Sequence, residues 1–400
     1  MTLHRAVIVG ASHAGAQLAA SLRQEGWDGE IVLVGNESAL PHHRPPLSKA
    51  YLAGKCTVDE LAIRNAEFYT KQRIKLMDAT VEVLDRSAGH LSLTTGDALP
   101  YDKLALCTGA RPRRLSIPGA DLPGVCYLRT AADVAMIRER TSPGRRAVIV
   151  GGGYIGLEAA ASLRALGLEV TVLEATERVL ERVTAPAVSA FFDRIHREEG
   201  VDIQTDALVD AMSGDGRVRE VILASGESIP ADLVIVGIGV EPNTDLAAAA
   251  GLAIDNGVVI DDQARTTDPD IVAAGDCASH HMARYGRRIR LESVPGAGEQ
   301  AKVAAATICG KSKKVAALPW FWSDQYDVKL QIAGLNTGYD EVVLSGDPTR
   351  DRDFTCFYLR AGELIAADCI NRPRDFVFSK RVITQQVPIE RAELMLAGPA

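Results

Sequence analysis

Two glycine-rich turns have the spacing that suits one particular chemistry, the binding of a pyrophosphate. They read Gly10-x-Ser12-x-x-Gly15 and Gly151-x-Gly153-x-x-Gly156. In such a turn the first glycine permits a sharp bend, the second lets the backbone approach a pyrophosphate, and the third lets a helix pack on a strand. The N–H groups at the helix start then face the phosphates. The spacing predicts two dinucleotide sites, the first with a serine at the point of closest approach.

A polar side chain at the end of the next strand is expected to bind the adenosine ribose in each site. Glu174 occupies this place after the second turn, where a carboxylate accepts both ribose hydroxyls and repels a 2′-phosphate. This residue therefore favours NAD over NADP. After the first turn the sequence offers Asn36 and Glu37, and either side chain can serve.

The two turns belong to two copies of one β-turn-α-β unit. Residues 5–10 (RAVIVG) recur as residues 146–151, and residues 19–23 (AASLR) recur as residues 160–164 at the same spacing. Each copy has an apolar run, a glycine turn, an alanine-rich helical stretch and a second apolar run. The repeat predicts an α/β protein with two Rossmann-like dinucleotide-binding domains.

Three further segments are predicted to end strands at functional loops. Residues 104–112 (LALCTGARP) present Thr108 and Gly109, residues 233–243 (LVIVGIGVEPN) present Gly239, and residues 267–276 (TDPDIVAAGD) end on Asp276. An aspartate at that place is suited to bind a ribityl hydroxyl of FAD beside the pyrophosphate. Two dinucleotides in one chain indicate that hydride passes from a nicotinamide to a flavin.

Composition excludes several other classes of protein. The 400 residues carry a net charge of -8 with both signs interspersed, which disfavours nucleic acid as a partner. No apolar run is long enough to span a membrane. The seven cysteines are odd in number and widely spaced, which favours a reducing, cytoplasmic compartment. The adjacent histidines at 42–43 and 280–281 diverge in direction, so we expect no metal site.

Rarer motifs carry a resemblance to a known family. These are residues 41–54 (PHHRPPLSKAYLAG), Arg129, residues 292–295 (ESVP) and residues 319–326 (PWFWSDQY). With the strand-end segments, they resemble the NADH-dependent ferredoxin reductases of bacterial cytochrome P450 and ring-hydroxylating dioxygenase systems, from about residue 5 to about residue 390. The resemblance implies FAD and NAD as cofactors, NADH as hydride donor, and an acidic 2Fe–2S ferredoxin that accepts electrons one at a time.

The resemblance also implies roles for individual residues. It gives Lys49, Glu158 and Trp322 as the candidate catalytic residues, with Trp322 near the flavin edge at the ferredoxin docking face. It adds to the FAD site Ala14, Arg44, Pro45, Lys49, Val81, Arg129, Asp276 and Val294. It gives the NAD site as Gly151, Gly153, Ile155, Gly156, Glu158, Glu174 and Gly239. Because an acidic reductase needs a local basic patch to attract an acidic partner, ferredoxin docking is expected near Arg64, Lys302 and Lys329.

The expected architecture is glutathione-reductase-like. Residues 1–112 and 245–316 form the FAD-binding domain, residues 113–244 the NAD-binding domain, and residues 317–400 a C-terminal α+β domain with an antiparallel sheet. An NADH oxidase, or a peroxide or disulfide reductase, is the first alternative, but it needs a cysteine beside the flavin where this chain reads HHRPP. A redox flavoprotein of the apoptosis-inducing type is the second, but such proteins bind nucleic acid through basic surfaces.

Overall fold

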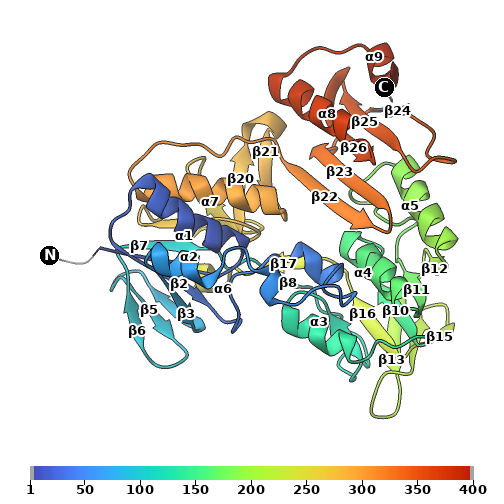
Figure 1. Ribbon diagram of the computed structural model, residues 1–400, viewed down its shortest axis with the longest axis horizontal. Helices are drawn as coiled ribbons and strands as arrows, with labels where there is room; N and C mark the ends of the chain where they lie inside the picture. Colours follow the sequence, from blue (N-terminus) through green and yellow to red (C-terminus); the bar gives the residue numbers. More distant parts are fainter. Residues whose placement is uncertain (1–3, 397–400) are drawn as a thin grey trace. The chain divides into compact units, whose positions relative to one another are not determined.

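The computed structural model describes residues 4–396 and divides into two compact units (Figure 1). The first unit takes the chain up to Arg44, then Thr57–Arg111 and Val240–Ala317. The second unit takes Pro45–Cys56, Pro112–Gly239 and the chain from Leu318 onward. The short segment Pro45–Cys56 therefore groups with the second unit, although it lies within residues 1–112, the predicted first part of the FAD-binding domain. The finer division into three domains stays a prediction.

A five-stranded parallel sheet forms the centre of the first unit, in the order β19-β7-β1-β2-β3. Its strands are β1 (Arg5–Val9), β2 (Glu30–Gly35), β3 (Ile74–Asp78), β7 (Lys103–Leu106) and β19 (Ile271–Ala273). Because helices α1 (His13–Glu25) and α7 (Val294–Ile308) are rich in alanine and glycine, they pack closely side by side. Gly26, with a φ of 99°, ends α1 in the left-handed conformation typical of a helix C-terminus.

Smaller elements complete the first unit. Two three-stranded sheets consist of β4 (Val81–Asp85), β5 (His90–Leu93) and β6 (Ala98–Pro100), and of β18 (Val258–Ile260), β20 (Ala278–Met282) and β21 (Arg287–Arg290). The remaining elements are α2 (Ala66–Lys71), α6 (Asp245–Ala249), η2 (Asp59–Leu61), η3 (Ala283–Tyr285) and the paired short strands β8 (Ala110–Pro112) and β17 (Val240–Pro242).

The second unit repeats the parallel sheet, in the order β12-β11-β10-β16-β9. Its strands are β9 (Val125–Tyr127), β10 (Arg146–Val150), β11 (Glu169–Leu173), β12 (Val201–Gln204) and β16 (Leu233–Val236). The other elements are η1 (Pro45–Ser48), α3 (Ala131–Arg138), α4 (Tyr154–Ala165), α5 (Pro186–Glu198) and the antiparallel strands β13 (Val209–Ser213), β14 (Glu220–Leu223) and β15 (Ser228–Pro230). Thus β1-α1-β2 and β10-α4-β11 are the two copies that the repeat predicted.

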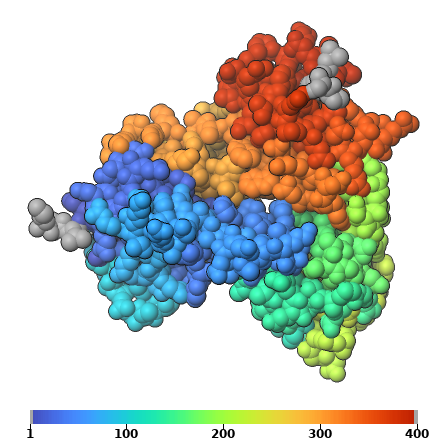
Figure 2. All heavy atoms as spheres, in the orientation of Figure 1, coloured from blue at the N-terminus to red at the C-terminus, as the bar shows by residue number. Residues whose placement is uncertain are grey.

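An antiparallel sheet follows in the second unit, in the order β22-β23-β26-β25-β24. It consists of β22 (Trp320–Gln325), β23 (Val328–Gly334), β24 (Glu341–Ser345), β25 (Phe354–Arg360) and β26 (Glu363–Ile370), followed by α8 (Pro373–Gln385) and α9 (Arg391–Leu396). The predicted C-terminal α+β fold is confirmed. Strand β22 packs on α4, and the orange and red atoms of this sheet adjoin green atoms of the β10-α4-β11 copy (Figure 2).

No helix within residues 4–396 is long and apolar enough to cross a membrane.

Candidate functional site

The first glycine turn follows β1 and leaves no room for larger side chains at either end. A Cβ on Gly10 would lie 2.0 Å from the carbonyl oxygen of Cys107, and a Cβ on Gly15 would lie 1.9 Å from that of Gly10. Ser12 is the N-cap of α1, but its hydroxyl makes no capping hydrogen bond and instead accepts one from Nε of Arg44 at 3.0 Å. The N–H groups at the start of α1 are therefore not satisfied by this side chain and suit a phosphate.

The two candidate ribose residues after β2 have different surroundings. Asn36 is exposed, whereas Glu37 is partly buried and forms an ion pair with Arg44. Glu37 also lies 3.8 Å from Nε2 of His42. Arg44 thus joins Ser12 of the glycine turn to Glu37 at the strand end, and the choice between Asn36 and Glu37 stays open.

The loop that ends in Asp276 lies directly beside the first glycine turn. Gly275 adopts a φ of 88°, and a Cβ on it would lie 3.0 Å from the Cβ of Ala14 in α1. The N–H of Gly275 donates to the side chain of Gln300 in α7 at 2.8 Å. Helix α7 starts at Val294, after the N-cap Ser293. The structure therefore brings the predicted Ala14 and Asp276 together at one edge of the sheet.

Thr108 and Gly109 follow β7 on the same edge. The Thr108 hydroxyl donates to the carbonyl oxygen of Asn243 at 2.7 Å, and the Asn243 amide donates back to the carbonyl oxygen of Thr108 at 2.8 Å. The N–H of Asn243 donates to Gly109 at 2.9 Å. These bonds hold the strand exit rigidly beside Gly10, and the predicted Val81 begins strand β4 of the same unit.

The second glycine turn, after β10, has the same tight ends and an open middle. A Cβ on Gly151 would lie 2.5 Å from the carbonyl oxygen of Gly237, and one on Gly156 would lie 2.1 Å from that of Gly151. A Cβ on Gly153 meets no atom within 4 Å, and the N-cap at Gly153 provides no side-chain capping bond. Ile155, two residues further along, is 44% exposed.

Glu174 lies at the end of β11, beside the second turn. Its carboxylate accepts hydrogen bonds from the backbone N–H of Gly152 at 2.7 Å and from the backbone and hydroxyl of Thr176, each at 3.0 Å. Gly239, with a φ of 97°, follows β16 and accepts a bond from Arg113. Both predicted residues thus lie at the carboxyl ends of parallel strands, where ligands of open α/β sheets bind.

Lys49 and Glu158 form a buried ion pair within the second unit. Lys49 Nζ lies 2.8 Å from Glu158 Oε1, and the Glu158 side chain is 2% exposed. Two serines complete the set: Ser48 donates to Glu158 Oε2 at 2.6 Å and Ser323 donates to Oε1 at 2.6 Å. The prolines of η1 fix the turn that places Ser48 and Lys49 against α4. A carboxylate buried to this extent is stable because three donors compensate its lost hydration.

The remaining predicted residues occupy separate places. In the second unit Pro45 accepts a bond from Lys49 at 3.3 Å, Arg129 precedes the capped start of α3, and the Trp322 ring lies 5.6 Å from that of Trp320. Lys329 is exposed on β23. In the first unit Lys302 is exposed on α7, whereas Arg64 binds Gln17 and lies over the Phe68 ring.

The paired histidines do not converge. His43 Nδ1 faces His13 Nε2 at 3.2 Å, whereas the ring of His42 faces the carbonyl oxygen of Leu40. His280 is buried beside Gln300, and its neighbour His281 is exposed. Burial lowers the pKa of both His43 and His280, so these rings favour the neutral form.

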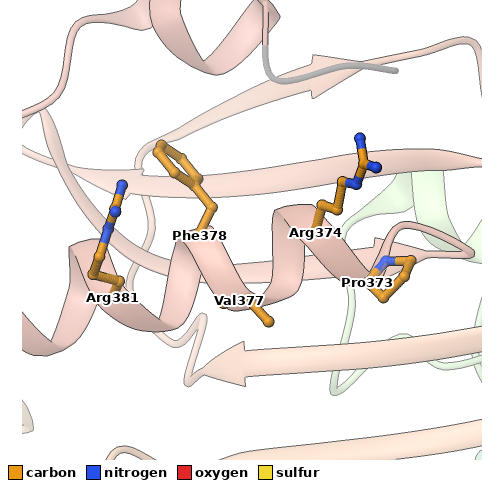
Figure 3. Close-up of a pocket in the computed structure, with 5 residues that line it drawn as sticks. All are labelled: Pro373, Arg374, Val377, Phe378 and Arg381. Atoms are coloured by element: carbon orange, nitrogen blue, oxygen red, sulfur yellow. The ribbon is translucent and has the colours of Figure 1, made fainter. Parts of the chain in front are cut away.

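A hollow of about 520 Å³ lies along α8 at some distance in sequence from these residues (Figure 3). It is lined by Pro373, Arg374, Val377, Phe378 and Arg381. None of the predicted site residues lines it.

The residues present fit two dinucleotides. Both glycine turns lie at strand ends with tight outer glycines, and both helix starts lack a side-chain cap on their N–H groups. The open space at Gly153 leaves the backbone accessible to an approaching pyrophosphate. Sequence reasoning missed Ser48 and Ser323, although both stand next to predicted residues within the RPPLSK and PWFWSDQ motifs.

The chain belongs to the pyridine nucleotide-disulphide oxidoreductase family, whose model matches residues 4–304. A second model, described as reductase C-terminal, matches residues 320–398. Proteins of this family use FAD and NAD(H).

Among its relatives, putidaredoxin reductase of Pseudomonas putida is 46% identical over 391 residues, 96% of this chain and 92% of that protein. A ferredoxin–NAD(P)(+) reductase of a Sphingomonas species is 44% identical over 393 residues, 97% of this chain and 95% of that protein. The crystal structure of the covalent putidaredoxin reductase–putidaredoxin complex matches with a TM-score of 0.95 and 46% identity, covering 98% of this chain and 95% of that one. The resemblance stated from the motifs is therefore confirmed.

Proposed function

We propose that this protein is an FAD flavoprotein that takes a hydride from NADH and passes electrons one at a time to a 2Fe–2S ferredoxin, which feeds a cytochrome P450 or another oxygenase. The observation that carries the proposal is the pair of uncapped glycine turns together with the buried Lys49–Glu158 pair. The names of the similar reductases support it, since they act on ferredoxins.

Most of the residues that would hold FAD belong to the first unit, whereas Pro45, Lys49 and Arg129 belong to the second, as do the residues that would hold NAD. Ala14 at the first turn lies beside Gly275, the neighbour of Asp276, and Glu174 binds the backbone of Gly152 in the second turn. When bound, the flavin accepts two electrons as hydride and releases them singly. The chain's own part is to orient and to exclude water, since this transfer needs no nucleophile. Lys49 and Glu158 supply one cation and one anion that are held in a fixed geometry by Ser48 and Ser323.

Thiol chemistry of the disulfide reductase kind has weak support in this chain. The thiolate is the reactive form of a cysteine, and burial raises the pKa of Cys107, Cys126 and Cys277, and also of Cys309, Cys356 and Cys369. The seventh, Cys56, lies at the end of the segment that carries Lys49. These six protonated thiols also support our proposal that the protein works in the reducing cytoplasm.

The acidic ferredoxin is proposed to dock near Arg64, Lys302, Lys329 and Trp322. Lys302 and Lys329 are exposed cations, as electrostatic attraction of an acidic partner requires. Arg64 is held in place by its bond to Gln17, so its charge has a defined position in the first unit.

The test combines two half-reactions measured on the purified flavoprotein. Anaerobic mixing with NADH should bleach the flavin absorbance, and adding putidaredoxin should then stimulate NADH-dependent cytochrome c reduction. Glu158→Gln should slow the first step, whereas Glu169→Gln, an exposed glutamate on β11, should leave it unchanged. Rapid flavin reduction without stimulation by any 2Fe–2S ferredoxin, or faster reduction of peroxide or disulfide, would defeat the proposal.

A further inference from the structure

A continuous line of hydrogen-bonded side chains leads from Glu158 to Tyr326, the residue that follows β22. Ser323 Oγ lies 2.6 Å from Glu158 Oε1, and Gln325 Nε2 lies 3.1 Å from Ser323 Oγ. Gln325 Oε1 lies 2.8 Å from Nε2 of His196, whose Nδ1 lies 3.1 Å from the hydroxyl of Tyr326. All five residues belong to the second unit.

The chemistry of these groups fixes the direction of every bond. Glu158, paired with Lys49, is a carboxylate that can only accept, so the single proton of the Ser323 hydroxyl points to it. Ser323 must then accept from the amide NH2 of Gln325, which leaves the Gln325 oxygen to accept from His196. His196 therefore carries its proton on Nε2, and its Nδ1 accepts from the Tyr326 hydroxyl. Every donor in the line points toward Glu158.

The line is buried at positions where apolar side chains would avoid the free-energy cost of removing polar groups from water. Ser323 and Gln325 are each 1% exposed, and His196 is fully buried. Burial keeps His196 neutral because it lowers the pKa of the imidazole. A buried polar network stabilises a fold only when its members satisfy one another, and partners of this kind polarise one another. Each of the four side chains that follow Glu158 (Ser323, Gln325, His196 and Tyr326) has its partner only because the next one is present.

Tyr326 occupies a backbone conformation that its side chain disfavours. It lies between β22 and β23 with a φ of 56°, the left-handed region that suits glycine or asparagine in tight turns. Its ring stands edge-on to His196, with the centroids 5.0 Å apart. The hydroxyl of this strained turn residue contacts His196, so Tyr326 forms the outer end of the line.

We propose that His196 and Gln325 are positioning residues for Glu158, and that the one-way line of donors from Tyr326 keeps the Glu158 carboxylate oriented toward Lys49. The inference rests on the proposed hydride transfer, in which this ion pair takes part. The line does not conduct protons. A relay through Gln325 would require its amide nitrogen to lose a proton while its oxygen gains one, which would convert the amide into its imidic acid form.

Other charges lie at both ends of this line and belong in any pH analysis. Lys49 and the buried Tyr154 hydroxyl face Glu158. Asp193 and Glu199 act on His196, and Glu199 and Arg164 act on Tyr326. Glu199 thus faces the outer end of the line, where it opposes ionisation of the Tyr326 hydroxyl.

The first experiment needs no NADH. Long-range 1H–15N correlation on ring-labelled protein reports the histidine tautomer, with His196 assigned from the signal lost in His196→Asn. We expect the Nε2–H tautomer at neutral pH in the wild type and a loss of this preference in Gln325→Leu. An Nδ1–H tautomer in the wild type would overturn the proposal, whatever the protein's function.

The second experiment follows flavin reduction by NADH across pH. If Glu158 must be ionised, the rate falls on the acid side where it protonates. Removing its direct donor in Ser323→Ala should move this acid limb upward, because a hydrogen bond to a carboxylate favours the charged form. Gln325→Leu only weakens that donor, so its upward shift should be smaller.

Two milder variants keep the test decisive if Gln325→Leu does not fold. Tyr326→Phe removes one oxygen from the outer end and should give a smaller upward shift than Gln325→Leu. Tyr339→Phe removes a hydroxyl of the same sheet domain outside the line and should match the wild type. Equal slowing at every pH, with no movement of the acid limb in Ser323→Ala, would reduce these residues to a structural role. A solvent deuterium isotope effect that disappears in Tyr326→Phe would indicate a proton wire and would also contradict the proposal.

Discussion

Asp368 is a buried carboxyl whose replacement should stabilise the protein at neutral and alkaline pH. It lies on β26 at 1% exposure, with Oδ2 accepting from the Tyr358 hydroxyl at 2.5 Å. Its Oδ1 has no hydrogen-bond partner among the described residues. Desolvation by burial raises the pKa of Asp368 from 3.8 to about 7, against the lowering effect of the Tyr358 hydrogen bond.

The sign of the pH dependence follows from proton binding. Between pH 3.8 and about 7 the folded protein keeps a proton on Asp368 that the unfolded chain has released, so stability falls as the pH rises. Each pH unit in this window costs about 1.4 kcal/mol, which sums to about 4 kcal/mol above pH 7. Asp368→Asn keeps the acceptor for Tyr358 and cannot ionise, so this loss should be absent.

The assay is urea unfolding at several pH values between 5 and 8.5, followed by tryptophan fluorescence. Trp320 and Trp322, two of the three tryptophans, lie on β22 of the same sheet as Asp368. The advantage of Asp368→Asn over the wild type should grow with pH and level off above pH 7. The exposed Asp351→Asn serves as the control and should follow the wild type. Parallel curves for Asp368→Asn and the wild type would show that the carboxyl does not titrate in this window.

Three further outcomes follow from the candidate sites. The methyl group of Gly153→Ala would lie in open space, so this variant should weaken NADH binding without lowering the thermal midpoint. The methyl group of Gly156→Ala would collide with the turn and should destabilise the protein by roughly 1–3 kcal/mol. Calorimetry and NADH titration compare the two variants. Glu174→Ala should reduce the preference for NADH over NADPH in spectral titrations, and an unchanged ratio would contradict its ribose role. Charge reversal of Arg64 and Lys302 to Glu should slow ferredoxin reduction while ferricyanide reduction stays intact; equal loss of both would exclude docking there.

The parts of the fold that the sequence predicts are those whose signals are local. A glycine turn, the apolar run before it and the helix after it lie within about thirty residues of one another, and their physical requirements leave few alternatives. Both copies are therefore where the repeat placed them. The Lys49–Glu158 contact joins distant segments, and only the resemblance to known reductases placed the two residues near each other. Its serine donors carry no local signal, since Ser48 and Glu158 are 110 positions apart.

Strand β22 shows why the rest could not be predicted from pattern alone. In the segment PWFWSDQY, three bulky aromatic residues in a row hide a period of two. In the structure, Ser323 and Gln325 alternate with Trp322 and Asp324, and the two polar residues are the buried ones. A sheet normally buries the apolar face of a strand. This strand instead buries a hydroxyl and an amide group, which form hydrogen bonds with Glu158 and His196. The departure from the ordinary pattern is therefore itself the signal of a polar site.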